Sequence, residues 1–284
     1  SLSMSHFSIA GMQLSLPCGD NLKTIGQELT KTNKRFPWID MIVLSELCTY
    51  GPEKKYAATL PSKAEKFYCA FAKELNLGLI PGSDYELCDD EIFNTTSVIN
   101  NEGVVIERYR KIYPFLPYEK GVSCGNDFVV FDVPQGRIGV AICYDLWFPE
   151  VSRELTCLGA EVLIYPTLTG TIDREVELSM ATATAVTNQC YVIAVNGLGD
   201  YGNGKSIIVA PDGSVIHQAG INKEIFPVEI DFSVVRRNRE RGIHGLGQPL
   251  KSFRDNPIEF SYNKETARKN SALNKLGPLE VPKS

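Results

Sequence analysis

Histidine is scarce in this chain of 284 residues and occurs only as His6, His217 and His244. Each has an ordinary surface or loop interpretation, so a cysteine–histidine pair is not favoured. The eight cysteines include no CxxC pair, and several lie within apolar segments such as KAEKFYCAFAKEL. We therefore expect free thiols in a reducing compartment, no structural zinc site, and no metal or other cofactor.

The sequence also lacks a basic excess, a long apolar run and a leader pattern. Its formal net charge is -5, whereas nucleic-acid phosphates select basic surfaces. No apolar run approaches the roughly 18–20 residues that cross a bilayer. The first residues, SLSMSHFSIAG, lack the basic start and apolar centre of a signal peptide. We expect a cytoplasmic protein with neither a membrane nor a nucleic acid as its partner.

What is present is an alternation of strand and helix patterns from end to end. Hairpin signals stand at residues 101–103, 134–136 and 212–213. No linker or change in composition divides the chain, so we expect one domain over residues 1–261, followed by a polar tail over 262–284. Two mixed sheets with helices on their outer faces would use all the segments, which predicts an α/β fold built as a four-layer α-β-β-α sandwich.

Three polar residues stand where apolar segments end. Glu46 ends MIVLSE, which we interpret as a strand, Lys111 follows VVIERYR, and Cys143 separates the strand RIGVAI from a helix expected to begin at Pro149. Taken singly, each has a commoner interpretation: a loop carboxylate, a surface lysine and a small buried hydrophobe.

Taken together, in the order Glu, Lys, Cys, these segments resemble the nitrilase superfamily of carbon–nitrogen hydrolases. The resemblance runs from about His6 to Phe260, and its most specific part is GVAICYDLWFPEVSRELTCLGAEVLIYPT. It implies that Glu46, Lys111 and Cys143 form a catalytic triad. The segment FLPYEKGVSCGND resembles the loop that carries a second glutamate in the amidase branch, here Glu119. Cys-Tyr-Asp differs from the Cys-Trp-Glu of true nitrilases, which favours an amidase.

The residue types suit the chemistry. A thiol attacks as the thiolate, which we expect the helix start after Cys143 to favour. Desolvation raises a carboxylate's pKa, so that Glu46 can act as a base, and Lys111 places positive charge where an oxyanion forms, together with the backbone N–H of Tyr144. We expect a thioester on Cys143 that water then hydrolyses, with Glu119 orienting the substrate or holding Lys111.

Five further side chains could line the substrate pocket, although each is also an acceptable packing residue: Tyr50, Tyr118, Tyr144, Trp147 and Thr169. Relatives often carry arginine where this chain has Trp147, and the lack of that arginine weakens the case for carbamoyl-amino acids or ω-amides as substrates. Asp145 and Glu150 are expected to cap the helix start.

Three functions remain open at this point. The first is hydrolysis of a small non-peptide amide, and the second uses the same site for nitrile hydrolysis or acyl transfer to an amine. The third is a catalytically idle scaffold or binding protein of the same fold. The resemblance also implies a small-molecule amide as partner and a homo-oligomer paired across the helices that follow the nucleophile segment.

Overall fold

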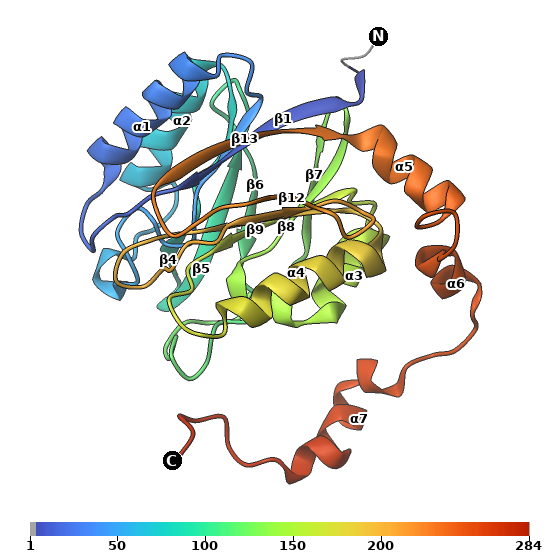
Figure 1. Ribbon diagram of the computed structural model, residues 1–284. Helices are drawn as coiled ribbons and strands as arrows, with labels where there is room; N and C mark the ends of the chain where they lie inside the picture. Colours follow the sequence, from blue (N-terminus) through green and yellow to red (C-terminus); the bar gives the residue numbers. More distant parts are fainter. Residues whose placement is uncertain (1–3, 284) are drawn as a thin grey trace.

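The computed structural model describes residues 4–283, and the strands within them form two mixed β-sheets (Figure 1). In spatial order, the described strands of the first sheet are β13 (Glu224–Asp231), β1 (His6–Gln13), β2 (Met41–Val43), β3 (Gly78–Ile80), β5 (Glu91–Ile99) and β4 (Asp84–Cys88), with β6 (Val105–Arg110) also paired to β5. Those of the second sheet are β12 (Val215–Gln218), β11 (Ile207–Val209), β10 (Tyr191–Asn196), β9 (Val162–Thr167), β8 (Gly136–Val140) and β7 (Val129–Val133). The expected hairpins are present as β5–β6, β7–β8 and β11–β12.

Helices cover the outer face of each sheet, as Figure 1 shows. They are α1 (Leu22–Arg35) and α2 (Lys63–Leu75) on the first sheet, and α3 (Pro149–Cys157) and α4 (Arg174–Asn188) on the second. Ile25 of α1 and Tyr68 of α2 are fully buried in one apolar cluster, and Leu155 of α3 and Ala181 of α4 are fully buried in another. The predicted α-β-β-α sandwich is confirmed.

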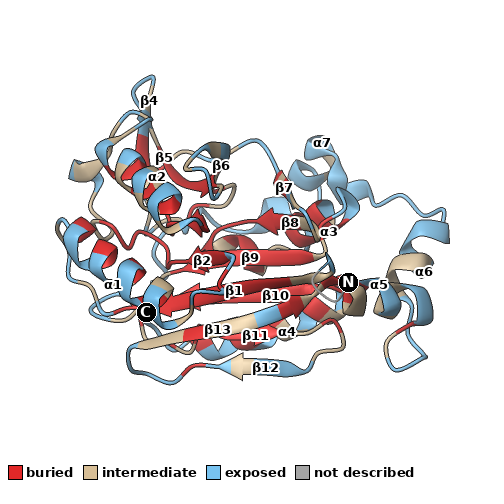
Figure 2. Cartoon of the chain, turned by 90° about the horizontal axis from the view of Figure 1, so that it is seen from above, coloured by how far each residue is buried: buried red, intermediate tan, exposed pale blue. Residues whose placement is uncertain are grey.

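Parallel strands form the centre of each sheet and position the functional loops. β1, β2 and β3 run parallel, as do β8, β9 and β10. These central strands are almost entirely buried (Figure 2), which explains their continuous apolar runs. Since the carboxyl ends of parallel strands meet at one edge of a sheet, the loops after β2, β8 and β9 are brought to common edges.

Three local features differ from the sequence-based expectation. β2 ends at Val43, so Glu46 lies in the loop after the strand and not at the strand's end. The edge strand β4 was not expected, because its acidic residues and the Asp89-Asp90 turn conceal its alternating pattern. Cys143 begins a short 3-10 helix, η3 (Cys143–Trp147), before α3 starts at Pro149.

The remaining described helices lie outside the two sheets. They are η2 (Lys54–Tyr56), α5 (Phe232–Arg241), α6 (Pro249–Asp255), η4 (Ser261–Asn263), α7 (Glu265–Lys269) and η5 (Ala272–Lys275). Nearly all side chains from residue 256 to 283 are exposed (Figure 2). The division into a domain and a tail at residue 262 stays a prediction. Among residues 4–283, no helix has both the length and the apolar character needed to cross a membrane.

Candidate active site

Cys143 is the first residue of η3, in the tight turn that follows β8, and its backbone lies in the left-handed region at a φ of 43°. A non-glycine residue pays roughly 1–2 kcal/mol for this conformation, so the surroundings must hold it in place. Asp145 supplies that support. Its carboxylate accepts the backbone N–H groups of Ile142 and Tyr113, both at 2.9 Å, and the hydroxyl of Tyr109 at 2.5 Å.

Asp145 is fully buried, and burial raises its pKa to about 6, although the Tyr109 hydroxyl and the two N–H groups act in the opposite direction. With three donors around it, this carboxylate fixes the shape of the nucleophile turn. Asp145 does cap a helix start, but it is that of η3, whose N-cap residue Ile142 donates its N–H to the carboxylate; the expected helix at Pro149 has no side-chain cap, from Asp145 or from Glu150.

Lys111 joins two glutamates in a buried cluster. Its ammonium donates to Glu46 Oε2 at 2.8 Å and to Glu119 Oε1 at 2.5 Å. Lys111 is 1% exposed and Glu46 is 3% exposed, so neither charge is shared with solvent. Lys111 directly follows β6, and Glu46 is fixed by its backbone N–H, which donates to the Thr167 carbonyl at 3.2 Å.

Asn94 of β5 completes this cluster, although no sequence motif predicted a functional residue at this position. Its Nδ2 donates to Glu46 Oε2 at 2.8 Å and to Glu119 Oε2 at 3.3 Å, so one amide bridges the two carboxylates. Tyr85 of β4 adds a hydroxyl 3.5 Å from Glu119 Oε2. The sequence offers only the asparagine in the predicted strand NTTSVIN, a residue type depleted in strands. Its full burial, which requires a polar partner, is visible only in the structure.

The cluster sets the charge states of its members. Burial raises the pKa of Glu46, and the adjacent Lys111 only partly offsets this. Burial lowers the pKa of Lys111, but the two glutamates outweigh it and raise that pKa well above its usual value. Burial likewise raises the pKa of Glu119, yet Lys111 and neighbouring N–H donors bring it below the ordinary range. Glu119 and Lys111 therefore stay charged, and Glu46 is the member best suited to exchange a proton.

The Cys143 thiol behaves differently from the sequence-based expectation. Burial raises its pKa well above the usual value, and the carboxylates of Glu46 and Glu177 raise it further, against the opposing effect of Lys111. The helix that was expected to favour the thiolate begins only at Pro149, beyond the short 3-10 turn. Cys143 is therefore a neutral thiol at rest and needs a base.

A cavity of about 370 Å³ brings the predicted catalytic residues together. It is lined by Glu46, Lys111, Glu119 and Cys143, and also by Tyr118, Tyr144, Trp147 and Thr169. Thr169 places its hydroxyl 3.7 Å from the sulfur of Cys143. Tyr144 and Trp147 form an aromatic wall with ring centroids 5.6 Å apart, and the exposed Tyr118 lies at the opening.

Tyr50 is the predicted pocket residue that the structure places elsewhere. It stacks on Tyr56, with ring centroids 4.5 Å apart, and lines a separate pocket that includes Asp84. The loop after Glu46 turns back through Leu47, whose φ is 54° and whose carbonyl accepts the N–H of Gly51 at 2.8 Å. This turn carries Tyr50 away from the cavity, which the sequence did not reveal.

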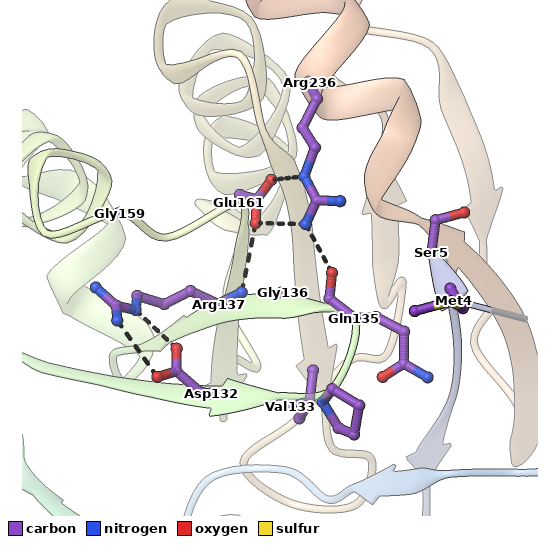
Figure 3. A pocket seen from close by; sticks show the side chains of 11 residues that line it. Met4, Ser5, Asp132, Val133, Gln135, Gly136, Arg137, Gly159, Glu161 and Arg236 are labelled. Atoms are coloured by element: carbon purple, nitrogen blue, oxygen red, sulfur yellow. Dashed lines mark hydrogen bonds and ion pairs between the residues drawn. The ribbon is translucent and has the colours of Figure 1, made fainter.

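A larger and more open hollow of about 740 Å³ lies at the opposite end of β8, near Gly136 and Arg137 (Figure 3). Its charged groups pair with each other: Arg236 with Glu161 at 2.9 Å, and Arg137 with Asp132 at 2.8 Å. The predicted catalytic residues all lie at the other cavity, which is therefore the candidate active site.

Within residues 4–283, no group of three or more histidine, cysteine or acidic side chains is arranged to hold a metal ion.

The family model for the carbon–nitrogen hydrolases matches residues 20–240. The chain belongs to the carbon–nitrogen hydrolase family. It is accordingly an enzyme of this class, and the amidase-like branch of the nitrilase superfamily named from the sequence is confirmed.

Individual relatives agree with this assignment. The chain is 30% identical to the omega-amidase NIT3 of Saccharomyces cerevisiae over 82% of its own length and 89% of the relative's. It is 34% identical to the deaminated glutathione amidase of Dictyostelium discoideum over 61% and 67% of the two chains. The crystal structure of Saccharomyces cerevisiae Nit3, a member of branch 10 of the nitrilase superfamily, superposes with a TM-score of 0.77 at 29% identity, covering 83% of this chain and 94% of that one.

Proposed function

We propose that the protein hydrolyses the carbon–nitrogen bond of a small non-peptide amide through a thioester on Cys143. The observation that carries the proposal is the Lys111 ammonium held between Glu46 and Glu119 in the cavity that Cys143 also lines. The similarity to an omega-amidase and to a deaminated glutathione amidase supports an amide as the substrate.

The first half of the reaction forms the acyl-enzyme. Glu46 accepts the thiol proton as the sulfur of Cys143 bonds to the amide carbon, and the carbonyl electron pair moves onto oxygen. Lys111 and the backbone N–H of Tyr144 stabilise this oxyanion, and one preorganised donor of this kind contributes on the order of 3–4 kcal/mol. Glu46 then protonates the departing nitrogen, the carbon–nitrogen bond breaks, and ammonia or an amine leaves behind a thioester.

The second half regenerates the thiol. Glu46 accepts a proton from a water molecule as its oxygen attacks the thioester carbon, and the collapsing intermediate expels the sulfur. The proton returns from Glu46 to Cys143, and a carboxylic acid is released. Throughout, Glu119 keeps Lys111 charged and in position, while Asn94 holds the two carboxylates in register.

Ammonia release from a panel of small amides tests the proposal, with Cys143→Ala as the matched inactive variant. Mixing enzyme with substrate and quenching at short times should reveal, by peptide mass spectrometry, an acyl group on Cys143. Release of ammonia that survives Cys143→Ala, or an acyl group on a different cysteine, would contradict the mechanism. Turnover accelerated by an added amine would indicate acyl transfer instead.

We further propose a homo-oligomer and a cytoplasmic location. Exposed apolar side chains support the first, among them Leu158 at the end of α3 and Val176 of α4. The eight unpaired cysteines are compatible with a reducing compartment. Light scattering coupled to gel filtration measures the mass in solution, and a monomer across the micromolar range would contradict the oligomer.

A further inference from the structure

The lining of the active-site cavity includes a carboxylate that the proposed mechanism does not use. Glu177 of α4 lines the cavity and is 3% exposed. Its two oxygens have only long polar contacts: Oε2 accepts the Trp147 Nε1–H at 3.3 Å, and Oε1 forms a 3.4 Å ion pair with Nη1 of the buried Arg174. A buried carboxylate with such weak partners retains the capacity to accept a stronger donor from a ligand.

Arg174 is the nearby cation that would attract an anionic ligand if it faced the cavity. It is 1% exposed, donates through Nη2 to the Lys205 carbonyl at 2.9 Å, and has a buried Nε without a hydrogen-bond partner among the described residues. Of Arg174 and Glu177, however, it is Glu177 that lines the cavity. The carboxylate of this buried ion pair therefore faces the cavity, and its guanidinium is not part of the lining.

The other charged groups at the cavity do not make its lining positive. The acidic and basic residues that line it, among those the structure describes, are four carboxylates and two lysines: Glu46, Glu119, Asp173, Glu177, Lys54 and Lys111. Lys111 is already paired with two carboxylates. Lys54 is exposed and donates to the Lys120 carbonyl, so solvent and salt screen its charge.

From this arrangement we infer that the substrate is a small amide whose far end is positively charged, such as an ω-amino amide, and that Glu177 selects it. The inference rests on the proposed amidase function and adds the substrate class. An ammonium group near Glu177 gains a charge-assisted hydrogen bond, whereas a carboxylate there meets a like charge at a desolvated site. The aromatic wall of Tyr144 and Trp147 accommodates the methylene spacer.

A matched series of three amides with the same methylene spacer tests the inference: the ω-amino amide, the plain alkyl amide and the ω-carboxy amide. We expect kcat/KM of the wild-type protein to favour the ω-amino amide over the ω-carboxy amide by at least about tenfold, a difference of about 1.4 kcal/mol. In Glu177→Gln, which removes the carboxylate charge and leaves the charge of Arg174 uncompensated, that ratio should fall to about one or reverse.

Glu175→Gln is the matched control, because it removes the same charge from the same helix. Glu175 is exposed and pairs with Lys205 outside the cavity lining, so its loss should leave the ratio unchanged. The plain alkyl amide and a thermal melt report on the integrity of each variant. A wild-type preference for the ω-carboxy amide, or a ratio unaltered in folded Glu177→Gln, overturns the inference while leaving the amidase proposal intact.

Alkylation of Cys143 provides a readout that needs no turnover. Iodoacetamide is neutral and iodoacetate is anionic, and peptide mass spectrometry separates Cys143 from the other cysteines. We expect Glu177→Gln to increase the rate with iodoacetate relative to iodoacetamide by about threefold or more, since it removes a negative charge beside the sulfur. An unchanged ratio of the two rates refutes a selecting role for Glu177 even if none of the three amides is cleaved.

Discussion

Replacing Asn94 by leucine examines the part of the active site that is hidden from the sequence. The two side chains are similar in size, but leucine donates no hydrogen bond and excludes the water that could replace one. Glu46 then loses one of its two donors at 2.8 Å and keeps Lys111, and Glu119 loses a weaker donor at 3.3 Å. The donor stabilises the charged form of Glu46, so its removal raises the pKa of that carboxyl further.

The structure gives the size of the expected effect. A hydrogen bond to a charged group contributes about 1.5–3 kcal/mol, and the 2.8 Å bond to Glu46 is the one that counts fully. We therefore expect kcat/KM near neutral pH to fall about tenfold to hundredfold in Asn94→Leu. Since the reaction needs Glu46 deprotonated before attack, the acid limb of the kcat/KM profile should also move to higher pH.

The assay is ammonia release measured across pH, with Thr96→Val as control. Thr96 lies two residues further along β5, is fully buried, and its hydroxyl has no partner among residues 4–283. Its replacement should leave both rate and profile unaltered, because no hydrogen bond is lost. If folded Asn94→Leu keeps kcat/KM within about threefold of wild type and its acid limb in place, the reasoning about the bridging amide is wrong.

Two further predictions concern stability. Burial raises the pKa of Asp84 from 3.8 to about 7, so the folded protein retains a proton that the unfolded chain has released, and stability falls as pH rises through that window. Asp84→Asn should therefore stabilise the protein by about 2–4 kcal/mol more near pH 8 than near pH 4, as measured by urea unfolding. Asp127→Asn, at an exposed position, is the control. An equal effect of Asp84→Asn at both pH values contradicts this reasoning. Asp145→Ala should lower the free energy of unfolding by about 3–5 kcal/mol, because it leaves three buried donors without an acceptor. A melting temperature equal to that of wild type would show that the turn at Cys143 does not depend on Asp145.

The sequence predicted the architecture because its signals are local and strong. Buried runs such as VLIYPT and the turn residues between hairpin strands identify their elements without help from distant contacts. Glu46, Lys111 and Cys143 could be selected because each sits in a recognisable motif. The edge strand β4 escaped prediction because it carries Asp84 and Glu86, and acidic residues are depleted in strands.

What the sequence could not provide depends on pairing between segments that are far apart in the chain. Asn94 becomes part of the site only because β5 places it beside Glu46, 48 residues away. Tyr50 lies outside the site because Leu47 adopts a left-handed backbone conformation, which a leucine side chain does not predict. The charge state of Cys143 likewise depends on burial, which no local motif encodes.

The two halves of the catalytic machinery are anchored in different layers of the sandwich. Glu46 and Lys111 extend from the seven-stranded sheet, and Cys143 extends from the six-stranded one. Any slippage of one layer over the other would separate the base from the sulfur while every strand kept its own neighbours. Enzymatic turnover is consequently a more sensitive measure of the relative position of the two sheets than any spectroscopic measure of strand content. An acyl group bonded to the Cys143 sulfur and hydrogen-bonded to the Lys111 ammonium would link the two sheets and oppose their movement past each other.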